Sequence, residues 1–162
     1  KIIGPQAATF YVTTYIIAIL AAFGLITVFS ADSKEAADIS NYKGLFWKKP
    51  FLSVVFTLVL LSLAGIPLTA GFMGKYFILA SGIGNTSWLL VFTLVISSVI
   101  GLFYYLRIIS VMMKQNEKET IKNPLFYSAS GLLVLAFLGF LIVWLGLFPS
   151  WLMELVNTFF VV

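Results

Sequence analysis

The sequence predicts an all-α, polytopic membrane protein with four transmembrane helices, the second of them discontinuous, and a short interfacial helix near its C-terminal end. Of the 162 residues, 61% are hydrophobic and only 10% are charged. The mean hydropathy of +1.07 is far above that of soluble domains, which need a polar surface. Four apolar runs reach the length of about 20 residues that a helix needs to cross roughly 30 Å of hydrocarbon.

The four expected spans cover residues 6–30, 50–81, 87–113 and 125–148. Two charged loops, at 31–49 and 114–124, alternate with a short turn at 82–85. After Pro149, apolar residues recur at helical spacing, which predicts an interfacial helix too short to span again. We expect residues 1–162 to form one membrane domain, the C-terminal fragment of a larger subunit, because the chain begins at Lys1 without a signal peptide.

The lysines predict an orientation in the membrane. Both charged loops lie on the same side of a four-span bundle and carry seven lysines, whereas the opposite side has only Lys1. By the positive-inside rule, the loops are cytoplasmic and the C-terminus is outside. The basic net charge of +4 therefore reflects membrane orientation, and we predict no nucleic-acid partner. The seven lysines are Lys34, Lys43, Lys48, Lys49, Lys114, Lys118 and Lys122.

The composition also bears on cofactors. The chain has no cysteine and no histidine, so it lacks the usual ligands of zinc, haem and iron–sulfur clusters. Its acids all fall outside the expected spans. We therefore expect no redox site, cofactor or metal in this chain. The six acids are Asp32, Glu35, Asp38, Glu117, Glu119 and Glu154.

The second span contains residues that interrupt a helix. Pro67 has no N–H to donate to the carbonyl of Leu63, and its ring disfavours a helical residue before it. Three glycines, Gly65, Gly71 and Gly74, weaken the helix on both sides. We predict a break near 64–69, and broken helices often mark ion pathways in transporters. The alternative is an ordinary proline kink repaired by Ser62 or Thr69.

Lys75 is the only ionisable residue deep inside a span. A lysine at the centre of a membrane helix costs ~2.5–3.5 kcal/mol, and roughly 13 Å of helix separates it from the turn at Gly84. Thr69 is a possible N-cap of the second half-helix, whose positive end lies within two turns of the amine. Burial and that helix end favour the uncharged amine, so we interpret Lys75 as a proton relay in a hydrated channel. Snorkelling to the outer interface is the alternative.

The remaining polar groups have simpler interpretations. Arg107 lies about two turns from the cytoplasmic end of the third span, close enough to snorkel. Tyr104 and Tyr105 are expected in the aromatic belt at that interface. The Phe-Trp-Lys-Lys run at 46–49 is typical of an interfacial anchor.

The stretch at 61–77, with its Gly-Ile-Pro and Gly-Lys pairs, resembles the broken twelfth helix of the antiporter-like subunits of respiratory complex I, the bacterial NADH-quinone oxidoreductase. Tyr-Lys-Gly-Leu-Phe-Trp at 42–47 and Ile-Gly-Leu-Phe-Tyr-Tyr-Leu-Arg at 100–107 support the resemblance. It implies the last four of fourteen helices in a bacterial inner membrane, with Lys75 as a relay lysine. The family's other relay residues would precede Lys1.

The resemblance also implies partners: the other membrane-arm subunits, the lipid bilayer, protons and channel water. Among the antiporter-like subunits, one has a glutamate where this chain has Lys75, and another continues into a long lateral helix for which the chain has no room. The resemblance therefore favours the third. Two alternatives stay open: a subunit of a Mrp-type sodium/proton antiporter, and a structural membrane anchor in which Lys75 only pairs with a neighbouring acid.

Overall fold

The computed structural model describes residues 4–30, 38–114 and 129–160. These residues form helices and no strand, which confirms the all-α class. Two short elements, the 3₁₀ turn η1 and the helix α2, lie between α1 and α3. The elements in chain order are α1 (Gly4–Ser30), η1 (Ile39–Tyr42), α2 (Leu45–Lys48), α3 (Pro50–Ala64), α4 (Ala70–Gly84), α5 (Trp88–Met113), α6 (Ala129–Leu147) and α7 (Pro149–Phe160).

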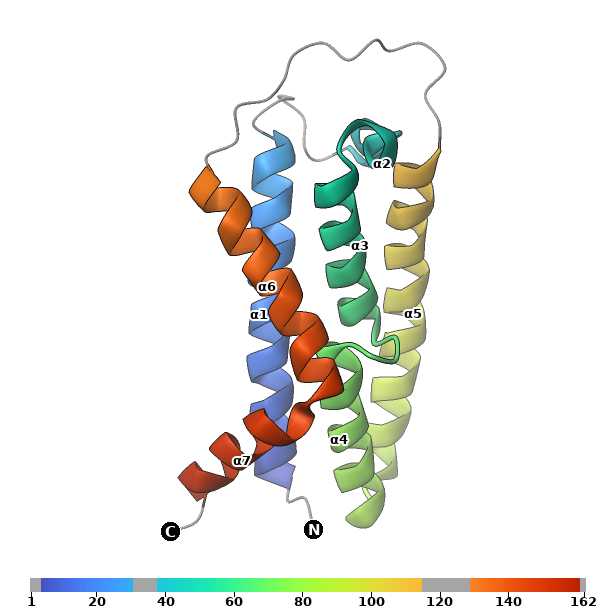
Figure 1. Cartoon of the computed structure of the whole chain (residues 1–162). Helices are drawn as coiled ribbons and strands as arrows, with labels where there is room; N and C mark the ends of the chain where they lie inside the picture. Colours follow the sequence, from blue (N-terminus) through green and yellow to red (C-terminus); the bar gives the residue numbers. More distant parts are fainter. Residues whose placement is uncertain (1–3, 31–37, 115–128, 161–162) are drawn as a thin grey trace.

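The helices form an upright bundle (Figure 1). α3 and α4 follow one another end to end in a single column, with α5 beside them, and α6 slants across the front of the bundle. α1 packs against α3, α4 and α6. α7 turns away from α6 by 85° and lies at the end of the bundle where both termini are found. The break between α3 and α4 therefore lies beside helices that are distant in sequence.

Two helices are long and apolar enough to cross a bilayer alone, Gly4–Phe29 and Trp88–Met113. α6 and α7 meet the same criterion only as a bent pair, and α3 is a shorter apolar helix of 15 residues. By length and composition, the described residues therefore contain two or three candidate spans. These helices support a location in the membrane.

Some boundaries differ from the expected ones. α4 continues to Gly84, three residues past the expected end of the span, so the prediction of a turn starting at residue 82 was wrong. The extra turn forms because Gly82 packs closely on side chains of α5 and because the Asn85 side-chain amide donates to the Ser81 carbonyl at 3.0 Å. The expected start of the fourth span at residue 125 lies outside the described residues.

The loop before α3 contains more structure than a charged linker. Tyr42 is buried, with its ring centroid 5.9 Å from that of Phe29. The indole of Trp47 donates to the carbonyl of Met113 at 3.1 Å, which ties α2 to the end of α5. Asp38 caps η1 by accepting the Ser40 backbone N–H at 2.9 Å, and this hydrogen bond lowers the pKa of the Asp38 carboxyl. Four-residue helices are too short for hydrophobic periodicity to reveal.

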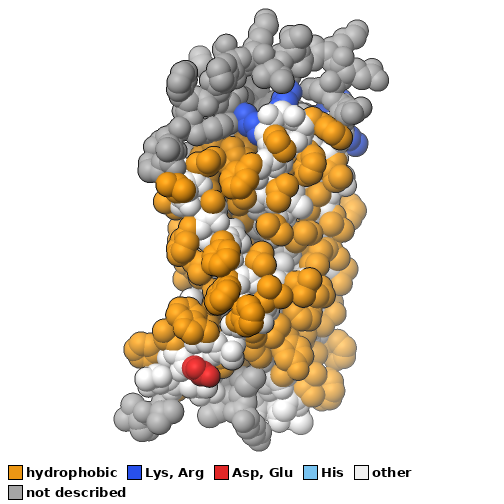
Figure 2. All heavy atoms as spheres, viewed as in Figure 1, with side chains coloured by type: hydrophobic (Ala, Val, Ile, Leu, Met, Phe, Trp, Pro, Cys, Tyr) orange, Lys and Arg blue, Asp and Glu red, His pale blue; other side chains and the backbone are white. Residues whose placement is uncertain are grey.

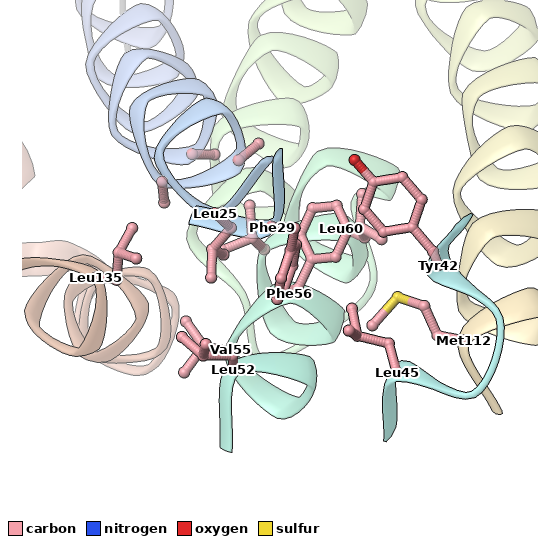
Figure 3. Close-up of a cluster of buried hydrophobic side chains, with 14 of the residues drawn as sticks. Leu25, Phe29, Tyr42, Leu45, Leu52, Val55, Phe56, Leu60, Met112 and Leu135 are labelled. Atoms are coloured by element: carbon pink, nitrogen blue, oxygen red, sulfur yellow. The ribbon is translucent and has the colours of Figure 1, made fainter. Parts of the chain in front are cut away.

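Two apolar clusters hold the bundle together. The larger lies where α1, α3 and α6 meet the loop elements, and Figure 3 shows Phe29, Phe56 and Tyr42 at its centre. The smaller joins α1, α4, α6 and α7, with the rings of Phe10 and Phe77 in an edge-to-face contact at 4.9 Å. Together they fix α1 against both halves of the broken column.

The outside of the bundle is apolar as well. Figure 2 shows hydrophobic side chains along the length of the visible face, with basic side chains gathered at one end and an acidic side chain at the other, over α7. Large side chains of α5 such as Leu89 and Phe103 are 84% and 66% exposed. Such a surface suits hydrocarbon rather than water. Lys34, Lys118 and Lys122 lie outside the described residues, as do Asp32, Glu35, Glu117 and Glu119.

Candidate functional site

The column of α3 and α4 is interrupted at residues 65–69. α3 ends at Ala64, and Gly65 follows in the left-handed region with φ +84°. The Gly65 N–H lies 3.0 Å from the carbonyls of Leu61 and Ser62, and the Ile66 N–H donates to Leu61 at 3.0 Å. This pattern is a Schellman motif, in which a glycine lets the chain fold back over the helix end. It satisfies two of the four carbonyls that a helix leaves unpaired at its C-terminus.

Lys75 satisfies the other two carbonyls. Its Nζ lies 3.0 Å from the oxygen of Leu63 and 3.0 Å from that of Ala64. The lysine belongs to α4, so its side chain reaches back across the break to the end of α3. Its aliphatic stem runs directly over Gly65, where an added Cβ would lie 2.8 Å from Lys75 Cδ. The amine is therefore a C-terminal cap supplied by the next helix.

This contact changes the expected electrostatics of Lys75. From the sequence, we expected the positive N-terminal end of its own helix to be the helix end nearest to the amine. The structure instead places the amine on the C-terminal end of the preceding helix, which carries partial negative charge and favours a cation. The part of the expectation that concerned the helix end was therefore wrong, because the Lys75 side chain reaches back across the break. The part that rested on burial stays a prediction.

The start of α4 is capped from α3. Thr69 holds the N-cap position with extended backbone (φ −112°, ψ 154°), but its side chain makes no capping bond. Its hydroxyl donates to the carbonyl of Ile66 at 2.7 Å. The Gly71 N–H donates to Ser62 Oγ at 3.1 Å, so Ser62 acts as the cap. Ser62 and Thr69 thus bond inside a real interruption rather than repairing a kink.

The predicted site residues divide into two groups. Gly65, Pro67 and Thr69 lie in the interruption, while Gly71, Gly74 and Lys75 lie in the first two turns of α4. Gly74 faces α1, where its Cβ position is 3.1 Å from Thr14 Oγ1. Arg107 is exposed on α5 and takes no part in this cluster.

A small cavity of about 10 Å³ lies beside Lys75, with room for roughly one water molecule. The residues that line it come from three helices. The α1 wall was not predicted, because outside its own helix only acidic residues were considered as neighbours of Lys75. The available signal was polar side chains three or four residues apart in an apolar span. The lining residues are Tyr11, Thr14, Tyr15, Ala18, Ser62, Leu63, Gly71 and Lys75.

The arrangement suits proton transfer better than group transfer. It offers one partly buried amine, hydroxyl side chains and room for water, with no carboxylate among the residues that line the cavity. No group of three or more metal-ligating side chains occurs in the part of the chain that the structure describes.

Comparisons with known proteins give consistent matches. Residues 1–101 match the family described as "NADH:quinone oxidoreductase/Mrp antiporter, TM". Relatives named NADH-quinone oxidoreductase subunit N include those of Ectopseudomonas mendocina (41% identity over 94% of this chain and 32% of the relative), Nitrosospira multiformis (43%, 81% and 29%) and Methylococcus capsulatus (41%, 92% and 30%). Subunit N is the branch that the sequence resemblance favoured.

A solved structure matches as well. A chain of the respiratory complex I from Thermus thermophilus with bound aureothin superposes with a TM-score of 0.73 and 26% identity, over 92% of this chain and 34% of that chain. The sequence thus spans about a third of the length of the proteins it matches.

Proposed function

This chain belongs to the NADH:quinone oxidoreductase/Mrp antiporter family of transmembrane proteins, and we propose that it forms the C-terminal part of subunit N, a proton-translocating membrane-arm subunit of NADH-quinone oxidoreductase. The names of the relatives support this assignment. In such a complex the chain would bind the other membrane-arm subunits and conduct protons, while quinone reduction takes place elsewhere. It would carry no cofactor of its own.

The proposal includes four membrane spans. α1 and α5 each span alone, and α3 and α4 together form one broken span. α6, at about 28 Å, is close to the roughly 30 Å thickness of the hydrocarbon and forms the fourth span. The described lysines Lys43, Lys48, Lys49 and Lys114 then lie on the cytoplasmic side of a bacterial inner membrane. The amphipathic α7, with Leu152 and Val156 packed inward, lies along the outer interface.

The observation that carries the mechanism is the pair of hydrogen bonds from Lys75 to the end of α3. An ammonium group has three N–H donors, and the Leu63 and Ala64 carbonyls accept two of them. The third N–H is left for the cavity beside the amine. When that proton passes to a water oxygen in the cavity, a lone pair on Nζ takes its place and both carbonyl bonds remain. Protonation from the same side reverses the step.

The cavity wall prepares the site for this transfer. Thr14 donates to backbone carbonyls of its own helix at 3.0–3.1 Å, and the rings of Tyr11 and Tyr15 stack with centroids 5.7 Å apart. These hydroxyl side chains can orient a water molecule that apolar walls would leave unbound. Because the end of α3 already fixes the amine, little reorganisation accompanies the transfer.

The test replaces Lys75 in the intact complex. We expect Lys75→Met and Lys75→Arg to abolish proton pumping at unchanged complex assembly: methionine has no exchangeable proton, and arginine keeps the charge but does not release it. Lys114→Met, at the end of α5, serves as the control and pumps normally. Full pumping by Lys75→Met would refute the proposal.

The same experiment separates the alternative functions. Sodium-dependent proton exchange without NADH oxidation would identify a Mrp-type antiporter. If Lys75→Gln disassembles the complex but surviving complexes pump normally, the chain is a structural anchor.

A further inference from the structure

One glycine of α6, Gly146, packs closely against the break. A Cβ built on Gly146 would overlap the Leu68 carbonyl oxygen and lie 2.6 Å from Thr69 Cα. Two other glycines of α6 differ: Gly131 has nothing within 4 Å of its Cβ position, and Gly139 meets only a side chain, that of Val55, at 3.0 Å. Gly146 is thus the described glycine of α6 at which backbone packs directly on backbone.

The segment under Gly146 is strained. Leu68 adopts φ +75°, a left-handed conformation that costs a residue with a Cβ about 1–2 kcal/mol. Its side chain is 68% exposed, so packing of that side chain does not offset the strain. Such a conformation persists only where the surroundings hold it. Here the holding contacts are Pro67 before it, the hydroxyl bond from Thr69 to Ile66, and the α6 backbone at Gly146.

The strained segment leads directly into the helix that carries the amine. Thr69, the N-cap of α4, is 5% exposed, and Ala70, its first residue, is 1% exposed, so packing sets the positions of both. The Lys75 bonds to α3 are 3.0 Å long, and a displacement of α4 by about 0.5 Å takes them to the limit of a hydrogen bond. Lys75 can therefore be misplaced by a small shift at Leu68 and Thr69.

We propose that Gly146 is a positioning residue for Lys75, which lets α6 press on Leu68 and Thr69 and so sets the distance between α4 and the end of α3. The inference rests on the proposed proton-relay function of Lys75. Gly146 lies 71 positions away in the sequence, and the atoms nearest its Cβ position belong to Leu68 and Thr69. A methyl group there must push the 68–69 segment away by roughly 1 Å to reach an ordinary contact distance of about 3.5–4.0 Å.

The first test is Gly146→Ala in the intact complex, with Gly131→Ala as the matched control on the same helix. We expect Gly146→Ala to lower the number of protons pumped per NADH about 10-fold or more, because a misplacement of 1 Å can cost ~100-fold. Quinone reduction and complex assembly should match the control. Equal pumping by the two variants would overturn the proposal.

A second variant separates positioning from general damage. In Leu68→Gly/Gly146→Ala, the glycine at 68 lets the carbonyl turn away from the new methyl group without strain. We expect the pair to recover most of the lost pumping. If assembly and quinone reduction fall together with pumping, and the pair does not recover, Gly146 is merely structural and the proposal fails.

A third measurement does not depend on proton pumping. The free energy of unfolding of the full-length subunit is compared for Gly146→Ala alone and in a Lys75→Met background. If Gly146 acts through Lys75, the methyl group destabilises the subunit less when the amine is already gone. If Gly146→Ala lowers the free energy of unfolding equally in both backgrounds, the inference about Gly146 is overturned, even if Lys75 is a relay. If Gly146→Ala costs less in the Lys75→Met background but Lys75→Met pumps normally, only the relay function is refuted.

Discussion

Replacing Gly65 by alanine tests how the amine of Lys75 is held at the break. Gly65 has φ +84°, and alanine in this region costs about 1–2 kcal/mol. The new Cβ would also lie 2.8 Å from Lys75 Cδ and 3.0 Å from Nζ, so the lysine stem has to move. If one of its two carbonyl bonds breaks, a further ~1.5–3 kcal/mol is lost, and the reduced freedom of the unfolded chain returns about 0.4–1 kcal/mol. We therefore expect a net loss of roughly 2–4 kcal/mol.

The assay is denaturant unfolding of the full-length subunit in mixed micelles, followed by circular dichroism. Gly84→Ala is the control, because it lies at the end of the same α4 helix and has nothing within 4 Å of its Cβ position. In a Lys75→Met background, no carbonyl bonds hold the side chain over Gly65, so the methionine can move aside. Gly65→Ala should then cost only the backbone strain less the gain from the unfolded chain, about 1 kcal/mol. The difference between the two backgrounds measures the coupling between the glycine and the amine.

Two results would refute this reasoning. If Gly65→Ala costs as little as Gly84→Ala, the left-handed turn at the end of α3 does not form. If it costs the same with and without the amine, the hydrogen bonds from Lys75 do not contribute to the stability of the break.

Three further predictions concern the surroundings of the site. Ser62→Ala removes the hydroxyl that caps α4 and should lower the free energy of unfolding by about 1 kcal/mol, whereas Ser62→Thr should retain the bond; equal losses would contradict the capping role. Phe10→Ala removes the edge-to-face contact with Phe77 and leaves a cavity, so it should lower the free energy of unfolding by about 3–5 kcal/mol. Phe10→Leu should lower it by less than half of that. The hydrogen bond from the η1 backbone lowers the pKa of the Asp38 carboxyl. The stability that this bond gives η1 is therefore fully present above the unfolded pKa of Asp38, and it is lost as the pH falls through the lower folded pKa. Asp38→Asn should remove that pH dependence in hydrogen exchange of η1; an unchanged profile would contradict it.

Much of the fold followed from patterns that are local in the sequence. Long apolar runs predicted the helices now seen at Gly4–Ser30 and Trp88–Met113, since hydrocarbon length fixes the number of residues a span needs. The loop before α3 could not be predicted in the same way. Its two short elements are held by contacts from distant residues, as in the bond between Trp47 and the end of α5.

The site shows the same division between local and distant information. The local signals were Pro67, the neighbouring glycines and the charge of Lys75, each recognisable because it is costly in an apolar helix. The hydrogen-bond partners of the amine could not be predicted, because every residue has a backbone carbonyl. Only the folded course of the chain brings those of Leu63 and Ala64 next to the amine. The packing role of Gly146 could not be predicted for a related reason. A glycine in an apolar span matters for packing only if another segment lies close against it, and the sequence does not show which segment does.

Under the proposed relay, the hydrogen bonds at the break let Lys75 change its charge while the carbonyls at the end of α3 stay paired. Two carbonyls of α3 depend on the Gly65 turn, which has no titratable group, and the other two depend on N–H donors that a lysine keeps in both protonation states. Loss of the proton weakens the attraction to the negative end of α3 but removes neither hydrogen bond. The amine can therefore exchange its third proton with the cavity while the backbone remains paired, as hydrocarbon surroundings require. A carboxylate at position 75 could not do this, because it has no proton to offer two carbonyls once it is ionised.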